Sequence, residues 1–192
     1  MRPLTSRQSL LLFVTFIFAM VATRSHHFAS SLHLPDASLA LFFLAGFYLR
    51  RLSAMLVLSM VAAVIDYIAI THQGVSSFCV TTAYPFLFLG YAALWYAGRW
   101  SATLHAKLSK VPVYAVAASL GLLTSYLFSN GSFYLLSGYV TDPSLTGYLQ
   151  QAAHYLKGYF TSPWLYWVIA ALIHSVIVMS VAARQQDAQQ HS

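Results

Sequence analysis

The sequence predicts an all-α integral membrane protein with six transmembrane helices, and three observations lead to this prediction. Hydrophobic residues make up 59% of the 192 residues, and charged residues make up only 7%. The acidic residues are four aspartates, too few charges for the surface of a soluble domain of this size. The hydrophobic residues also gather into long runs, and most basic residues lie between these runs. We therefore expect a lipid bilayer to surround most of the chain.

Six apolar segments are visible along the chain. A helix needs about 20 residues, at about 1.5 Å per residue, to cross about 30 Å of hydrocarbon. The third and sixth segments reach this length, whereas the first two need flanking residues. The segments cover roughly residues 9–23, 36–49, 52–71, 81–98, 112–128 and 163–183. Together they predict a single transmembrane domain over residues 1–192.

The basic residues predict the orientation of these segments. Only Arg24 and Lys157 lie on one side, and the other eight Lys and Arg residues fall on the opposite side. Cytoplasmic connections carry the excess of basic residues, so both termini are expected in the cytoplasm. The scattered placement of the charges forms no basic stripe, and nucleic acid is not an expected partner.

The first segment has an alternative interpretation as a secretory signal peptide, with a basic start, an apolar run and Ala22 before Thr23. Cleavage would leave five segments and break the alternation of charge, which favours a retained first helix. The sequence has no Walker-type phosphate loop, so we expect no ATP hydrolysis by this chain itself.

Residues 129–162 are predicted to form a long outer loop, because this stretch is rich in tyrosine and interrupted by Gly and Pro. Long loops are commonly functional, which makes this one a candidate lid. Within it, Leu145–Tyr159 fits an amphipathic helix at the outer interface. The alternative is an interfacial aromatic belt, as in membrane proteins generally.

Several polar side chains map to the outer half of the predicted bundle. Asp66 lies inside the third segment, where a charge requires a partner or a water-filled cavity. Cys79, the only cysteine, lies at the outer entry to the fourth segment, and Tyr84 lies about one turn deeper. His26 and His27 follow the outer end of the first segment. Each has an ordinary structural explanation, such as a small buried thiol or an interface anchor, but their convergence favours an outward-facing pocket.

The residue types limit what such a pocket binds. A cysteine thiolate suits soft or borderline metals. One cysteine and one histidine do not complete a four-ligand zinc cage, but they fit axial positions of a metal held in a macrocycle, a haem or a corrinoid. Aromatic residues in the outer segments suit the flat face of such a ligand. Two alternatives stay open: a haem-binding membrane protein, and a cysteine transpeptidase or protease using Cys79, a histidine base, Asp66 and Arg24 as oxyanion donor.

The chain resembles the substrate-binding S-components of the energy-coupling-factor vitamin transporters, and more narrowly the solitary cobalamin-specific BtuM family. The resemblance covers essentially the whole chain. It rests on Phe78-Cys79-Val80 followed by Tyr84-Pro85, with Asp66 upstream and His26-His27 after the first span. It implies an S-component-like bundle that binds cobalamin (vitamin B12) and takes it up across the bacterial inner membrane, as a transport component rather than an enzyme.

The resemblance also implies roles for individual residues. Cys79 is expected to bind the cobalt of cobalamin as an axial ligand and to assist loss of the upper ligand, including cyanide. His27, Asp66 and Tyr84 are expected to line the ligand site, and the choice of His27 over His26 comes from the resemblance alone. S-components commonly carry Ala-x-x-x-Ala on the first span for an energising module. This chain instead has Thr15-x-x-x-Ala19-x-x-x-Thr23, which keeps small residues but not the motif. The altered motif fits a component that acts alone, and an energising module stays a candidate partner.

Overall fold

The computed structural model describes residues 4–24, 34–104 and 110–190, and this part of the chain contains helices and no strand. The all-α prediction is therefore confirmed for the described residues. The elements in order are α1 (Ser6–Arg24), α2 (Ser38–Tyr48), α3 (Leu52–His72), the 3₁₀ turn η1 (Ser77–Cys79), α4 (Phe86–Ser101), the 3₁₀ turn η2 (Ala102–Leu104), α5 (Val111–Leu136) and α6 (Leu145–Gln190).

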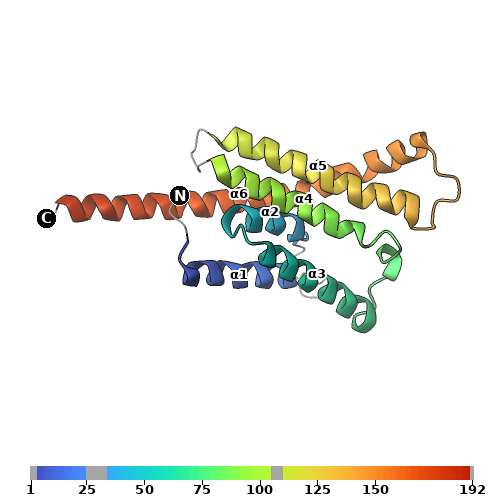
Figure 1. The fold of residues 1–192 in the computed structure, drawn as a ribbon, viewed down its shortest axis with the longest axis horizontal. Helices are drawn as coiled ribbons and strands as arrows, with labels where there is room; N and C mark the ends of the chain where they lie inside the picture. The colour runs from blue at the N-terminus through green and yellow to red at the C-terminus, as the bar shows by residue number, and fades with distance from the viewer. Residues whose placement is uncertain (1–3, 25–33, 105–109, 191–192) are drawn as a thin grey trace.

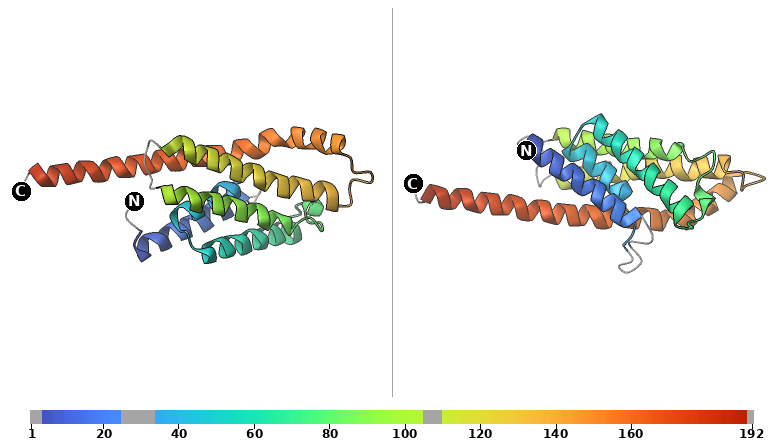
Figure 2. Two further views of the ribbon diagram at one scale, coloured as in Figure 1. Left: turned by 45° about the horizontal axis from the view of Figure 1, so that its top comes forward. Right: turned by 90° about the horizontal axis from the view of Figure 1, so that it is seen from below.

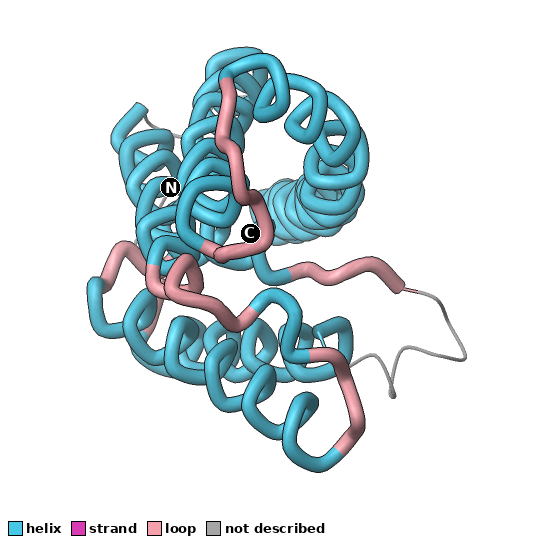
Figure 3. The backbone as a smooth tube through the Cα atoms, turned by 90° about the vertical axis from the view of Figure 1, so that its right-hand side faces the viewer, coloured by secondary structure: helices cyan, strands magenta, loops and turns pink. Residues whose placement is uncertain are grey.

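The helices lie side by side in an elongated bundle (Figure 1). The start of α1 and the end of α6 lie at one end of this bundle. The turn η1 and the connection between α5 and α6 lie at the other, and both views in Figure 2 agree. We call this second end the η1 end; Figure 3 looks onto it, with the connections in pink. The bundle thus brings the segment that carries Cys79 to the same end as residues 137–144.

Four of the described helices are long and apolar enough to cross a membrane: α1, α3, α5 and the part of α6 from Leu145 to Ser180. Their outward side chains include Phe18, Met60 and Leu172, which are 73%, 69% and 63% exposed. Exposed apolar surface on this scale needs a covering, and lipid supplies one. The structure therefore supports a membrane protein with four membrane-length helices.

The second and fourth predicted spans are shorter as helices than the sequence predicts. Helix α2 has 11 residues and extends about 16 Å, whereas α4 has 16 residues and extends about 24 Å. Pro85 explains the late start of α4, because proline is tolerated at the start of a helix and not in its interior. Residues 81–85 form turns instead, and Tyr84 N–H donates to the Thr81 carbonyl at 2.9 Å. Pro85 therefore precedes α4 and does not interrupt it.

Helix α2 forms the centre of the bundle. Phe42 is completely buried and stacks on Tyr91 of α4, with ring centroids 4.1 Å apart. The backbones of α2 and α4 also touch directly. A Cβ on Gly46 would collide with the Trp95 carbonyl oxygen, and a Cβ on Gly98 would collide with the Phe43 carbonyl oxygen. Small residues permit such close approach of helices in membranes, and here they bring the second half of α2 against α4.

The predicted outer loop at residues 129–162 is wrong as a loop. Helix α5 continues to Leu136 and α6 already begins at Leu145, which leaves only residues 137–144 as a connection. Gly147 in this stretch is a packing position within α6 rather than a break, because its added Cβ would meet the Tyr134 hydroxyl, whereas Gly138 does lie in the short connection. Helix α6 also runs through Pro163. The predicted helix from Leu145 exists, and it packs along α5, where Tyr126 donates to the Ala152 carbonyl at 2.6 Å.

Candidate functional site

An ion-pair network lies where the end of α1, the start of α2 and the second half of α3 meet. Arg24 is the last residue of α1, and Asp66 lies on α3 about a turn and a half before its end. Asp36 lies two residues before α2. All three side chains come from separate segments, so the packing of the helices, rather than local sequence, brings them together.

Arg24 and Asp66 form a two-pronged ion pair. Nε of Arg24 donates to Oδ1 of Asp66 at 2.6 Å, and Nη2 donates to Oδ2 at 2.7 Å. The side chains are only 11% and 22% exposed. Bidentate pairs between a guanidinium and a carboxylate are among the strongest and most specific hydrogen-bonded contacts. The charge that the sequence places inside the third apolar segment is therefore balanced by a residue from α1.

Tyr84 joins this network from the turn that precedes α4. Its hydroxyl donates to Oδ2 of Asp66 at 2.8 Å, so this oxygen accepts from both Arg24 and Tyr84. Asp66 and Tyr84 were two of the four residues that the resemblance places at the ligand site. The structure brings these two side chains into direct contact.

A second branch of the network fixes the start of α2. Nη1 of Arg24 donates to Oδ2 of Asp36 at 3.1 Å and to the Ser38 hydroxyl at 3.0 Å. The Asp36 carboxylate in turn accepts from the backbone N–H of Ser38 at 2.9 Å, a bond of the kind that caps a helix. Thr23 adds a link by accepting from the backbone N–H of Ala37 at 3.1 Å. One guanidinium thus serves two carboxylates.

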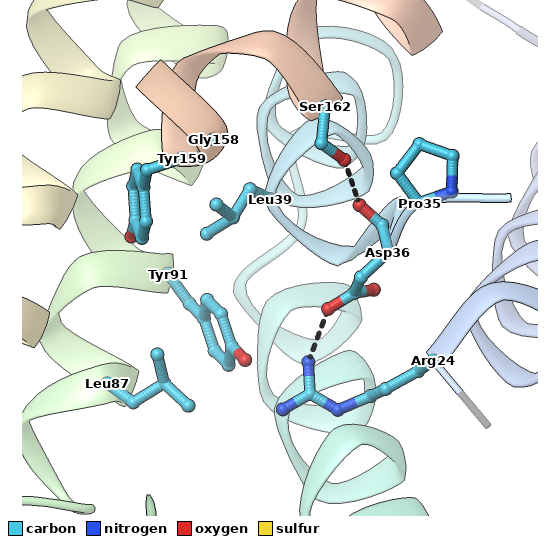
Figure 4. Close-up of a pocket in the computed structure, with 9 residues that line it drawn as sticks. All are labelled: Arg24, Pro35, Asp36, Leu39, Leu87, Tyr91, Gly158, Tyr159 and Ser162. Atoms are coloured by element: carbon cyan, nitrogen blue, oxygen red, sulfur yellow. Dashed lines mark hydrogen bonds and ion pairs between the residues drawn. The ribbon is translucent and has the colours of Figure 1, made fainter. Parts of the chain in front are cut away.

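A cavity of about 300 Å³ opens beside Arg24, on the side of Asp36 (Figure 4). Its walls combine charged, hydroxyl and apolar groups from α1, α2, α4 and α6. Ser162 of α6 borders the cavity and donates to the Asp36 carbonyl at 2.6 Å, so α6 is tied directly to the segment before α2. The lining residues are Arg24, Pro35, Asp36, Leu39, Leu87, Tyr91, Gly158, Tyr159 and Ser162. The volume is at the lower end of the range for small-molecule sites, roughly 300–1,000 Å³.

The structure does not describe the side chains of the other two predicted site residues, Cys79 and His27. The backbone of Cys79 ends η1, between α3 and the turn that carries Tyr84, but its side chain lies outside the described part of the structure. His27, like His26, lies outside the described residues. The cobalt-ligand role of Cys79 and the pocket role of His27 therefore stay predictions.

Sequence reasoning did not assign Asp36 to the site, and it named Arg24 only as the oxyanion donor of the alternative hydrolase, not as the partner of Asp66. A signal for Arg24 was present, because an acid inside a membrane segment requires a partner, and Arg24 is one of two basic residues on the predicted outer side. Asp36 carried no comparable signal, since its position at the edge of an apolar segment looks like an ordinary boundary.

The geometry bears on what chemistry the site supports. Arg24 uses Nε, Nη1 and Nη2 to bind Asp66, Asp36 and Ser38, so these bonds engage four of its five N–H donors in holding the helices together. Among the described residues, no group of three His, Cys, Asp or Glu side chains is placed to hold a metal ion.

Comparisons with known proteins give no family assignment: no protein-family model matches the chain, and no significant match was found among curated proteins. In the part of the chain that the structure describes, the fold and the site together define a helical protein with four membrane-length helices and a buried ion-pair network beside a cavity.

Proposed function

We propose that this protein binds cobalamin on the outer side of the bacterial inner membrane and takes part in its uptake, with the Cys79 thiolate as an axial ligand of cobalt. The observation that carries the proposal is the hydrogen bond between Tyr84 and Asp66. Two residues, 18 positions apart and both named by the resemblance, meet at the end of the bundle where the backbone of η1 includes Cys79.

The ligand chemistry supports this assignment. A thiolate is a soft donor and suits a cobalt centre already held by a corrin macrocycle. The binding step is a ligand exchange on cobalt(III). The Cys79 thiol loses its proton to water, and the sulfur electron pair forms the Co–S bond. The displaced ligand, water or cyanide, leaves with its own electron pair, so the oxidation state of cobalt does not change.

The proposed orientation places the η1 end outside. With six spans, α2 and α4 cross together with the four longer helices, and flanking residues complete their lengths. The eight basic residues then lie on the cytoplasmic side, and Arg24 and Lys157 lie on the outer side. In this orientation Arg24 is a basic residue on the outer side, and its ion pair with Asp66 explains why a basic residue lies there.

The size of the cavity implies a conformational step. A corrinoid with its nucleotide arm is larger than the cavity of about 300 Å³ beside Arg24. We propose that the part of α6 before Pro163 moves away from α2 when the ligand enters. This movement breaks the hydrogen bond from Ser162 to the Asp36 carbonyl. The candidate lid is then a helix rather than the predicted loop.

A spectral titration tests the proposal. Purified protein mixed with aquocobalamin is expected to shift the corrin absorption, because a thiolate replaces an oxygen ligand on cobalt. Cys79→Ala is expected to abolish the shift. Ser77→Ala, in the same 3₁₀ turn, is the matched control and is expected to keep it. An unchanged spectrum with the wild-type protein, or an undiminished shift with Cys79→Ala, would contradict the assignment.

A further inference from the structure

Three aromatic rings meet at the η1 end, next to Cys79. Phe78 stacks on Tyr139 with centroids 4.4 Å apart and an angle of 26° between the rings. Phe133 lies 5.3 Å from Phe78 and 5.9 Å from Tyr139, so all three rings are in mutual contact. We call these three residues the aromatic clasp. It joins η1 to the end of α5 and to the connection that leads into α6.

A second contact joins the same two segments on the other side of Cys79. The Thr82 hydroxyl donates to the Leu136 carbonyl at the end of α5. Phe78 lies directly before Cys79, and Thr82 lies three residues after it. The turn that carries Cys79 is therefore attached to the α5–α6 connection at two points, one apolar and one polar.

The bonds within the turn do not by themselves place it in the bundle. Val80 N–H donates to the Ser77 carbonyl at 2.8 Å, and Phe78 N–H donates to the Ser76 hydroxyl at 3.2 Å. These bonds shape a few neighbouring residues. A segment with mainly local bonds opens at low free energy unless tertiary contacts hold it. The clasp and the Thr82 bond supply such contacts, from residues more than 50 positions away.

The partner side of the clasp is itself a tight turn. Gly138 has φ of 79°, a left-handed conformation that glycine adopts without strain. The backbone N–H of Tyr139 donates to the Ser137 hydroxyl at 3.3 Å. This geometry turns the chain back after α5 and directs Tyr139 onto Phe78. The clasp therefore joins this tight turn to η1.

We infer that Phe78, Phe133 and Tyr139 are positioning residues, which couple the Cys79 turn to the α5–α6 connection so that the two segments open and close together. The consequence for ligand binding rests on the proposed function: opening of the α5–α6 side would carry the cobalt ligand with it. The coupling itself is a property of the protein without ligand.

Hydrogen exchange of the purified, ligand-free protein tests the coupling from both directions. Tyr139→Ala is expected to accelerate exchange of the backbone amides of residues 77–84 about fivefold, the effect expected from losing aromatic contacts. Phe78→Ala is expected to accelerate exchange of residues 137–144 by a similar factor, because coupling between two sites is reciprocal. Tyr139→Phe keeps the aromatic ring, so this variant is expected to exchange at the wild-type rate in both segments.

The controls separate coupling from general loosening. Tyr155→Ala removes a tyrosine of α6 with similar exposure, whose ring contacts His154, and is expected to leave both segments unchanged. Thr82→Val removes the second attachment and provides an independent variant if the alanine variants do not fold; it is expected to accelerate both segments. Acceleration confined to the segment that carries the substitution would overturn the inference.

A parallel aquocobalamin titration keeps this inference separate from the proposed function. If wild-type protein gives no spectral shift while the two segments remain coupled in exchange, cobalamin binding fails and the clasp stands. If the spectral shift is present while the segments exchange independently, the clasp fails and cobalamin binding stands.

Discussion

Arg24 binds two carboxylates at once, Asp66 through Nε and Nη2 and Asp36 through Nη1. The bonds to Asp66 are 2.6 and 2.7 Å long, whereas the contact with Asp36 is 3.1 Å. Asp66 is 22% exposed and Asp36 is 44% exposed. A buried carboxylate depends far more on its partner than an exposed one, because water stabilises the exposed charge. The two pairs should therefore contribute unequally to stability.

Asp66→Asn is expected to lower the free energy of unfolding by about 3 kcal/mol, because it leaves the buried guanidinium without its principal counter-charge. Asp36→Asn is the matched substitution and is expected to cost less than about 1 kcal/mol, since the amide oxygen still accepts from Ser38. Denaturant unfolding in detergent micelles measures both values. Equal losses for the two variants would contradict this ranking.

The Arg24 pair can also be tested by a double-mutant cycle. Arg24→Gln alone is expected to destabilise the protein strongly, because it leaves Asp66 as an uncompensated charge. Adding Asp66→Asn to this variant is expected to recover about 1 kcal/mol or more, since contacting residues are not additive. Unfolding free energies of the four proteins give the coupling. Strictly additive losses would mean that the two side chains contribute independently.

At the scale of elements, the short helix α2 owes its place to backbone contact. Seven of its residues are buried, and Gly46 and Gly98 bring its backbone against that of α4. Overpacking is costly where the neighbour is backbone, because a main-chain carbonyl cannot move aside as the end of a side chain can. The glycine contacts thus fix the second half of α2 against α4, while the bonds of Asp36 and Ser38 fix the segment at its start.

Gly98→Ala is expected to lower the free energy of unfolding by about 3 kcal/mol, because the new methyl group collides with the Phe43 carbonyl oxygen. Gly158→Ala in α6 is the matched control. No atom lies within 4 Å of its added Cβ, so this variant is expected to be neutral or up to about 1 kcal/mol more stable. Denaturant unfolding of both variants checks the prediction, and a neutral Gly98→Ala would be inconsistent with the observed helix contact.

The elements differ in how well the sequence predicted them. The apolar runs predicted α1 and α3 closely, at residues 9–23 and 52–71 against Ser6–Arg24 and Leu52–His72. The stretch 129–162 was misjudged because Gly and Pro act as breakers in isolated sequence. Gly138 and Pro143 do lie in the connection between α5 and α6, but Gly147 lies inside α6, where it admits the Tyr134 hydroxyl. Tertiary packing overrode the local signal at Gly147.

At the scale of the whole molecule, α6 is much longer than a membrane crossing. Its 46 residues extend about 69 Å, against about 30 Å of hydrocarbon. Figure 1 shows that its end projects beyond the rest of the bundle, on the side of the start of α1. Under the proposed orientation this projection enters the cytoplasm, and the part of α6 before Pro163 packs against α5 towards the outer side.

Single cysteines in a Cys79→Ala background test this orientation in intact cells. Asp142→Cys, in the α5–α6 connection, is expected to react with a membrane-impermeant maleimide. Arg51→Cys and Lys110→Cys are expected to react only after lysis, because α3 and α4 together return the chain to the same side. Labelling of Lys110→Cys in intact cells would mean that α4 does not cross.

The sequence by itself determined the kind of environment and the kind of element, since 59% hydrophobic residues in long runs leave lipid and helices as the solution. It also pointed to Asp66, because an acid in an apolar segment requires partners, whereas Tyr84 was named from its predicted outer position and from the resemblance. Only the tertiary structure decided that Arg24 is the ionic partner, that Asp36 shares it and that a helix replaces the outer loop. Those features depend on distances between segments far apart in the chain, which helix packing sets and no local pattern encodes.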